Sequence, residues 1–265
     1  MTESRFTHAL VRSVGSSLAK CQLAYLERQP LDLALAMRQH SAYVEALRSA
    51  GLEAAFLSDA PEMPDAVFVE DTAVLLDELA VLCRPALPSR QTELETVAQI
   101  LESVRPLRQI HPPGTLEGGD VLQIGRTLLV GRSQRTNDEG IRQFDAMVSA
   151  HGYRVLPVAV NGALHLKTAA TSPAPEFVLV NAHWVELSPF RRLGLEVCPV
   201  PAAEPWGANA LTVNGTTLVA GSAPQTAAML RTRGLKVQSL ELSELQKAEA
   251  GLTCLSLLYR QPAEP

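Results

Sequence analysis

The chain has 265 residues, of which 46% are hydrophobic and 19% are charged, and its formal net charge is -5. This composition is typical of a folded globular protein and excludes an intrinsically disordered chain. The mildly acidic balance argues against a nucleic-acid-binding protein, which needs a basic, clustered surface. No run of residues is long and apolar enough to cross a membrane.

Four cysteines are scattered along the chain without forming a CxxC pair: Cys21, Cys83, Cys198 and Cys254. This pattern favours reduced thiols in a cytoplasm over a disulfide framework or a zinc site. Residues 1–6 are polar and lack the apolar region of a signal peptide. We therefore expect a cytoplasmic protein, with a frayed tail at residues 261–265.

The first predicted elements are a strand at residues 8–12, a helix at 32–50 and a strand at 53–57. Apolar residues recur at helical spacing in the helix, and Gly51 is suited to its C-cap. The proline-rich segment 61–65 then breaks the pattern and predicts a loop.

From residue 67 onward, a unit of strand, strand, helix and strand repeats at a spacing near the roughly 40–50 residues of blade-like repeats. The first copy has strands at 67–76, 79–84 and 107–110 and a helix at 92–103. The Asn214-Gly215 pair is the strongest short hairpin signal in the chain. The later copies contain strands at 121–124, 127–130, 154–160, 164–171, 177–181, 210–213, 217–220 and 236–240, and helices at 138–150, 223–233 and 243–250.

A polar residue opens the first strand of each copy. In a closed radial arrangement the innermost strands surround a central channel, so their starts converge. We therefore predict an α/β fold, a five-bladed α/β propeller of repeated ββαβ units in one domain, residues 1–265. A strand at 254–259 would pair with 8–12 to close it. The alternative is an α/β sandwich without a repeat. The five opening residues are Asp65, Glu117, His165, Asn209 and Cys254.

Cys254 and His165 are a candidate nucleophile and base. Taken alone, a cysteine in an apolar strand is more often an inert core residue, and a histidine between leucines is more often a core histidine. Together they suggest catalysis, because a thiolate needs a base or cation nearby to exist at neutral pH. The order of the two residues, without a Cys-Gly-Ser-Cys-Trp segment, argues against a papain-like protease.

Carboxylates form the second candidate group. Glu70 and Asp71 interrupt a predicted apolar strand, which is costly unless they meet cations or donors. Either they point into a polar channel that accepts a cationic ligand, or the strand is misassigned. Glu117 and Asp120 flank two glycines, which allow close approach of the backbone but also suit a simple tight turn.

Two arginines precede predicted helices. Arg90 and Arg135 lie in loops, and an arginine fork matches a carboxylate in a bidentate manner. A surface position without function is the default reading of either residue alone.

Five segments occur in order with fitting spacing: PDAVFVED at 64–71, TLEGGD at 115–120, GRSQRTN at 131–137, GALHLKT at 162–168 and GLTC at 251–254. Together they resemble the dimethylarginine dimethylaminohydrolase family of the guanidine-modifying, pentein-type superfamily. The resemblance covers about residues 6–259. It implies a five-bladed α/β propeller and favours this compact family over the longer arginine deiminases and amidinotransferases.

The resemblance assigns the catalytic roles to three residues. It implies that Cys254 is the nucleophile and His165 the general acid and base. Glu117 would hold the guanidine nitrogens and the histidine. These roles imply a covalent S-alkylthiouronium intermediate and need neither a metal nor an organic cofactor.

The resemblance also assigns seven substrate-binding residues. Asp71 would bind the guanidinium with Glu70 beside it, and Asp65 would meet the amino-acid end. Arg90 and Arg135 would bind the α-carboxylate. The other two are Leu23, in a lid between the first strand and the first helix, and Ala248.

The chain departs from the family pattern near the nucleophile. The family has a bulkier apolar residue where Ala248 stands, and an Asp-Gly pair where Glu249, Ala250 and Gly251 stand. These differences concern the inner rim of the pocket.

The implied activity is hydrolysis of Nω-methylated or Nω,Nω-dimethylated L-arginine to L-citrulline and a methylamine. An arginine deiminase-like hydrolase of free arginine or another guanidine is a second reading, since a pocket distinguishes one methyl group by only about 1–3 kcal/mol. A non-catalytic amino-acid-binding propeller is a third. The expected partner is this small-molecule substrate, and we expect a monomer or homodimer.

Overall fold

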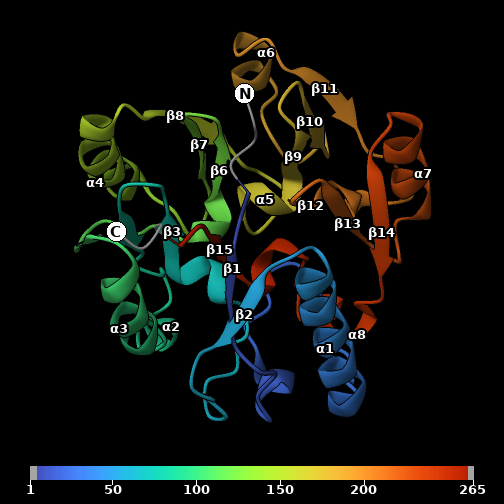
Figure 1. The fold of residues 1–265 in the computed structure, drawn as a ribbon, viewed down its shortest axis with the longest axis horizontal. Coiled ribbons are helices and arrows are strands. Elements are labelled where there is room, and N and C mark those ends of the chain that lie inside the picture. The colour runs from blue at the N-terminus through green and yellow to red at the C-terminus, as the bar shows by residue number, and fades with distance from the viewer. Residues whose placement is uncertain (1–4, 262–265) are drawn as a thin grey trace.

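The computed structural model describes residues 5–261. In this part of the chain the strands form five separate three-stranded sheets. Figure 1 shows the sheets arranged radially around a central axis, with helices toward the outside. The predicted five-bladed α/β propeller is therefore confirmed.

Each blade has the same plan, in which the middle strand runs antiparallel to the inner strand and parallel to the outer one. The blades, from inner to outer strand, are β15 (Leu257–Tyr259), β1 (His8–Val11) and β2 (Glu53–Phe56); β3 (Ala73–Leu75), β4 (Ala80–Leu82) and β5 (Leu107–Gln109); β6 (Val121–Ile124), β7 (Thr127–Arg132) and β8 (Arg154–Ala159); β9 (Ala170–Ala174), β10 (Phe177–Val180) and β11 (Glu196–Pro199); and β12 (Leu211–Val213), β13 (Thr216–Ala220) and β14 (Lys236–Leu240).

The last strand and the first strand share a blade. Leu10 of β1 pairs with Leu257 of β15, and His8 pairs with Tyr259. The predicted closure between the two ends of the chain is therefore confirmed.

The apolar core is divided among the spaces between neighbouring blades. Successive side chains of a strand point to opposite faces, so each middle strand contributes to two clusters. In β7, Leu128 and Val130 pack toward β3 and β4, whereas Leu129 packs toward β9 and β10. The middle strands are thus buried on both faces, which explains their continuous apolar sequences.

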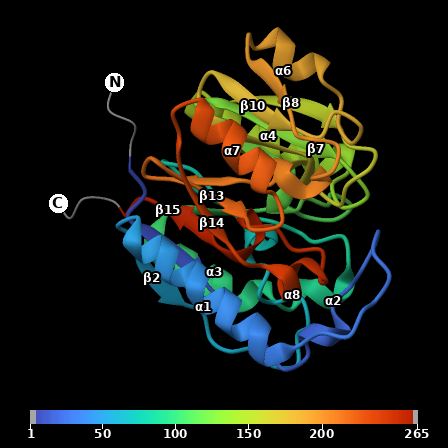
Figure 2. The same ribbon diagram turned by 90° about the vertical axis from the view of Figure 1, so that its right-hand side faces the viewer.

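The longer helices cover the outside of the blades. Figure 2 shows α1 (Leu33–Ser49) and α7 (Pro224–Thr232) on the outer side of β2 and β14. The side chain of Asp32 caps α1 by accepting from the Leu35 amide. Asn137 caps α4 (Asp138–Val148) in the same way through Gly140. The other outer helices are α3 (Leu94–Val104) and α6 (Ser188–Arg192).

The inner strands are entered through one turn of helix, and here the sequence prediction was wrong in detail. The predicted strands at 67–76, 164–171 and 254–259 each begin with a helical turn, and only their later residues are extended. The turns are η2 (Val69–Thr72), α5 (Leu166–Ala169) and η6 (Thr253–Leu255), together with η3 (Gly118–Asp120) and η5 (Pro205–Ala208) in the other two blades.

Two further differences from the predictions concern short helices. Arg90 lies in α2 (Pro88–Gln91) and not in a loop, because Pro88 starts a helical turn at the first position. The predicted helix at 243–250 is shortened to α8 (Ser243–Gln246), and Glu249 has a left-handed backbone with φ of 59°.

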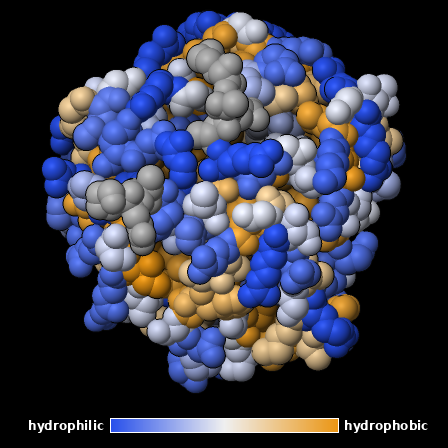
Figure 3. Space-filling model, in the orientation of Figure 1, coloured by the Kyte–Doolittle hydropathy of each residue, from blue (hydrophilic) through white to orange (hydrophobic). Residues whose placement is uncertain are grey.

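Figure 3 shows a mainly polar face with an apolar area in its lower middle, over the region of β2. Phe56 of this strand is 48% exposed. Within residues 5–261, no helix combines the length and apolar character that a membrane span requires. The single-domain organisation and the oligomeric state stay predictions, and residues 262–265 of the predicted frayed tail lie outside the described part of the chain.

Candidate active site

A pocket lies where the helical turns of the blades converge on the axis. Seven of the ten predicted site residues line it: Asp65, Asp71, Arg90, Arg135, His165, Ala248 and Cys254. Glu117 lies directly behind this lining, in contact with His165. The repeat therefore brings together side chains that are far apart in the sequence.

His165 lies between two carboxylates. Its Nε2 atom is 2.6 Å from Glu117 Oε2 and 3.6 Å from Asp71 Oδ1. Burial disfavours the charged imidazolium, but the charge of Asp71 and the hydrogen bond with Glu117 outweigh it and raise the pKa of His165 to about 9. The histidine is therefore a cation at neutral pH that donates to Glu117.

The absence of a side chain at Gly119 allows the Asp71 carboxylate and the His165 ring to lie close together. A Cβ atom at this position would lie 2.7 Å from Asp71 Oδ1 and 2.8 Å from the His165 ring. The Gly119 amide instead donates to Asp71 Oδ1 at 3.1 Å. The Gly118-Gly119 pair is thus a requirement of the site and not only of the turn.

Arg90 holds the other side of Asp71. Its Nη1 donates to Asp71 Oδ2 at 2.7 Å, and its Nε and Nη2 donate to Glu93. Nη2 also contacts the carbonyl oxygens of Asp65 and Phe68. Burial raises the cost of ionising Asp71, but the charges of His165 and Arg90 prevail and lower its pKa.

Arg135 has free hydrogen-bonding capacity. Its side chain is buried, and Nη1 has no hydrogen-bond partner among residues 5–261. The nearest carboxylate oxygen that pairs with it is Glu117 Oε1, at 3.8 Å. A buried guanidinium with an unused donor is suited to bind an anion.

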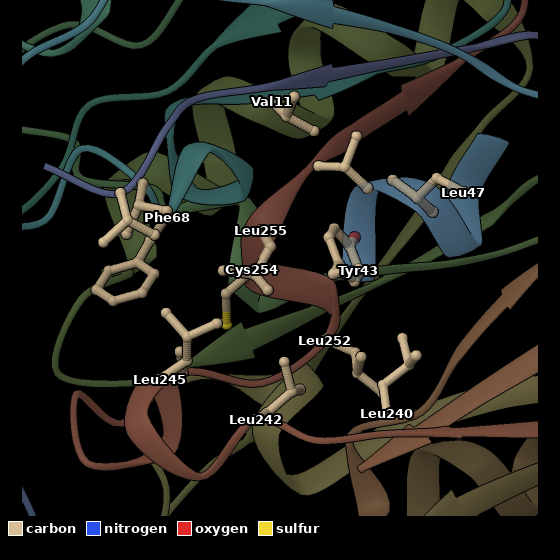
Figure 4. Close-up of a cluster of buried hydrophobic side chains, with 14 of the residues drawn as sticks. Val11, Tyr43, Leu47, Phe68, Leu240, Leu242, Leu245, Leu252, Cys254 and Leu255 are labelled. Carbon is tan, nitrogen blue, oxygen red and sulfur yellow. The ribbon is translucent and has the colours of Figure 1, made fainter. Parts of the chain in front are cut away.

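Cys254 is surrounded mainly by apolar side chains. Figure 4 shows its sulfur pointing toward Leu245 of α8, with Leu255 and Phe68 nearby. Burial, and then the charges of Glu70 and Asp71, raise the pKa of the Cys254 thiol to about 12. The Gly251 amide donates to Sγ at 3.4 Å but does not offset these effects. The free protein therefore holds a neutral thiol.

Glu70 is not part of the pocket lining. One of its oxygens pairs with Lys167 Nζ at 2.6 Å, and the other accepts from the Thr253 hydroxyl at 2.8 Å. Asn209 contacts the same hydroxyl and the Thr253 amide. Glu70 thus fixes the turn that carries Cys254.

The remaining predicted residues are Asp65 and Ala248, which line the pocket, and Leu23, which is not part of its lining. Asp65 Oδ1 accepts from the Gln22 amide at 3.0 Å, and Gln22 itself lines the pocket. Leu23, next to it, is partly buried against the core cluster that contains Cys254. Ala248 lines the inner rim.

Sequence reasoning missed several residues that support the site. Asp120 was noted as a carboxylate beside the two glycines but was given no role in the site. It accepts from the Leu166 amide at 2.8 Å and so orients the turn after His165. Lys167 and Glu93 were not singled out, and Glu249 was given no role. The signal for Lys167 was its place two residues after the histidine, whereas Glu249 was visible only as a departure from the family pattern.

The donor set of the site could also hold a cation. One ligand atom each from Asp71, Glu117 and His165 lies within 4.8 Å of the others. Carboxylate and imidazole ligands suit several divalent metals. Binding there would require His165 to lose its proton, because a metal ligand must be a neutral imidazole.

The fold and the site define a propeller with a cysteine, histidine and carboxylate centre on its axis. Residues 23–187 match the family model described as "N,N dimethylarginine dimethylhydrolase, eukaryotic". A Streptomyces coelicolor protein named N(G),N(G)-dimethylarginine dimethylaminohydrolase is 38% identical over 258 residues, covering 96% of this chain and 97% of the relative. The chain belongs to the dimethylarginine dimethylaminohydrolase family.

Solved structures agree with this assignment. The Pseudomonas aeruginosa enzyme, as a cysteine-to-serine variant complexed with citrulline, is 29% identical with a TM-score of 0.91, covering 97% of this chain and 100% of the neighbour. A histidine-to-glycine dimethylarginine dimethylaminohydrolase in an adduct with S-methyl-L-thiocitrulline is 30% identical with a TM-score of 0.91, covering 96% and 100%.

The charge of His165 can be tested directly. Glu117→Gln removes a carboxylate that raises the pKa of His165, so we expect this pKa to fall from about 9 toward its ordinary value. A titration of the ring by nuclear magnetic resonance measures it. Glu204→Gln, which alters a buried carboxylate that binds Gln225 and Thr226, is the control. An unchanged pKa in Glu117→Gln would contradict the described electrostatics.

Proposed function

We propose that this protein hydrolyses Nω-methylated L-arginines to L-citrulline and a methylamine. The observation that carries the proposal is the buried His165–Glu117–Asp71 cluster, which lies beside the Cys254 thiol and Arg135, whose Nη1 makes no hydrogen bond within residues 5–261. Family membership and the citrulline in a related structure support the same reaction.

The carboxylates supply the recognition of the guanidinium. Asp71 and Glu117 hold the negative charge of the pocket, and the cationic guanidinium hydrogen-bonds to them. Localising its delocalised charge makes the central carbon a better electrophile. Arg135 binds the substrate α-carboxylate with its free Nη1, and Asp65 binds the α-amine.

The two arginines contribute differently to this binding. The donors of Arg90 already serve Asp71, Glu93 and backbone carbonyls, so its main contribution is to hold Asp71 and to add positive charge. A direct contact of Arg90 with the substrate α-carboxylate stays a prediction. Arg135 is the principal anchor of the carboxylate.

Substrate binding generates the nucleophile. A guanidinium next to Cys254 opposes the charges of Glu70 and Asp71 and lowers the thiol pKa, so that the thiol releases its proton to solvent while His165 stays protonated. The thiolate attacks the guanidinium carbon, and a C–S bond forms in a tetrahedral adduct. His165 then donates its proton to the methylated nitrogen as the C–N bond breaks.

The second half of the reaction reverses the role of the histidine. The methylamine leaves, and an S-alkylthiouronium remains on Cys254. The now neutral His165 takes a proton from water, and the hydroxide attacks the same carbon. The hydroxyl of this second adduct gives its proton to solvent as the C–S bond breaks, which releases citrulline and returns the thiolate. We place this reaction in the cytoplasm, on the basis of the four free cysteines.

The decisive experiment is a product assay. Purified protein is incubated with asymmetric dimethyl-L-arginine or with L-arginine, and citrulline, dimethylamine and ammonia are measured. We expect citrulline and dimethylamine at a rate far above that with arginine, and no turnover in Cys254→Ser or His165→Ala with the fold intact. Ammonia released mainly from arginine would favour the deiminase reaction, and near-normal activity in either variant would refute the mechanism.

The role of Arg135 predicts a specific binding defect. Arg135→Met removes a charge-assisted hydrogen bond, typically about 1.5–3 kcal/mol, so KM for dimethylarginine should rise by about 10-fold to 100-fold. KM for the decarboxylated analogue of the substrate should change little, because this analogue has no carboxylate for Arg135 to bind. Arg132→Met, at an exposed arginine paired with Asp138, is the matched control. An equal effect on both substrates would contradict carboxylate binding by Arg135.

A further inference from the structure

The segment between the first strand and the first helix, where the family resemblance implies a lid, borders the pocket through Gln22. We call residues 22–26 the strap. At one end its Gln22 amide donates to Asp65 Oδ1 at 3.0 Å. Further along, the Tyr25 hydroxyl donates to the Ala163 carbonyl at 3.1 Å, two residues before His165. The strap thus spans from the blade of Asp65 to the segment that carries the histidine.

One carboxylate holds the backbone of the strap. Glu249 Oε1 accepts from the amides of Ala24, Tyr25 and Leu26 at 3.0, 2.6 and 2.6 Å. Its Oε2 accepts from Ala24 at 3.1 Å. Successive backbone N–H groups that converge on one anion form a nest. Hydrogen bonds to an ionised acceptor are about twice as strong as neutral ones.

The position of Glu249 is unusual in two respects. Its side chain is buried although it has no cationic partner among residues 5–261, so the strap amides replace the water it has lost. Its backbone has a φ of 59°, in the left-handed region that disfavours residues with a Cβ. Glycine would suit this backbone better, which indicates that the side chain performs a task.

Glu249 is also part of the pocket wall. It lines the pocket together with Ala248 and Ala250, on the segment that leads to Cys254. Tyr25 and Leu26 are 41% and 37% exposed, so little apolar packing holds the strap at these residues. The hydrogen bonds to Glu249 are therefore the main attachment of the strap above the pocket.

We propose that Glu249 is a positioning residue that fixes the strap over the pocket of Cys254 and His165. With the strap in place, Gln22 and Leu23 form one side of the substrate site and water is excluded from the reacting carbon. Entry of substrate and exit of product require the strap amides to separate from Glu249. The kinetic consequence of this attachment rests on the proposed function, whereas the attachment itself does not.

Hydrogen exchange of the strap amides tests the attachment without any activity. In Glu249→Ala and Glu249→Gly, we expect the amides of residues 24–26 to exchange at least about tenfold faster than in the wild type. The glycine variant relieves the backbone strain and so remains folded. Glu244→Gln is the control, because Glu244 is a nearby buried carboxylate that accepts from the Asp32 amide outside the strap.

Kinetics then separate positioning from a structural role. We expect KM for dimethylarginine to rise by about tenfold in Glu249→Gly with a smaller change in kcat. Glu249→Gln, which keeps one acceptor oxygen, should recover part of the loss.

Equal hydrogen exchange at residues 24–26 in the wild type and both variants would overturn the proposal. Faster exchange with unchanged kinetics would overturn the positioning role, and an inactive wild type with faster exchange in the variants would refute only the proposed function.

Discussion

The structure depends on burying carboxylates around the propeller axis, where each must meet a cation or an N–H group. Asp71 meets Arg90, His165 and the Gly119 amide, and Glu70 meets Lys167. An unpaired charge in such a position costs several kcal/mol. The helical turns at the inner ends of the blades follow from this constraint, because they bring these partners within reach.

The buried carboxylates also influence the protonation state of Cys254. Burial, and then the charges of Glu70 and Asp71, raise the pKa of Cys254. Asp71 and Glu117 raise the pKa of His165 against the effect of burial, so the free site holds a neutral thiol beside an imidazolium. In the proposed mechanism, the substrate guanidinium is the cation that offsets the negative charges around Cys254. Substrate binding and activation of the thiol are therefore one event in this mechanism, and the proposed role of Glu249 is to hold the strap that completes the enclosure.

The propeller could be predicted because its signals are local: hairpins recur at regular spacing, and Asn214 and Gly215 do adopt positive φ values in their turn. The helical turns before the inner strands could not be predicted. The apolar residues around Glu70 and Asp71 resemble a strand, and the backbone there is determined by contacts with residues distant in the sequence. Glu249 was missed for the same reason, as the amides it accepts from lie 223 to 225 residues away. Resemblance to a family supplied the site residues that spacing alone left open.

The central claim is that the arrival of a cation ionises Cys254, and the ultraviolet absorbance of the thiolate tests it most directly. The free protein and Cys254→Ser are compared at neutral pH, and each is then mixed rapidly with L-arginine or with its neutral counterpart L-citrulline. We predict no thiolate in the free protein, a thiolate signal with arginine and none with citrulline or in the serine variant. A thiolate already present in the free protein, or equal signals with the two amino acids, would contradict the account.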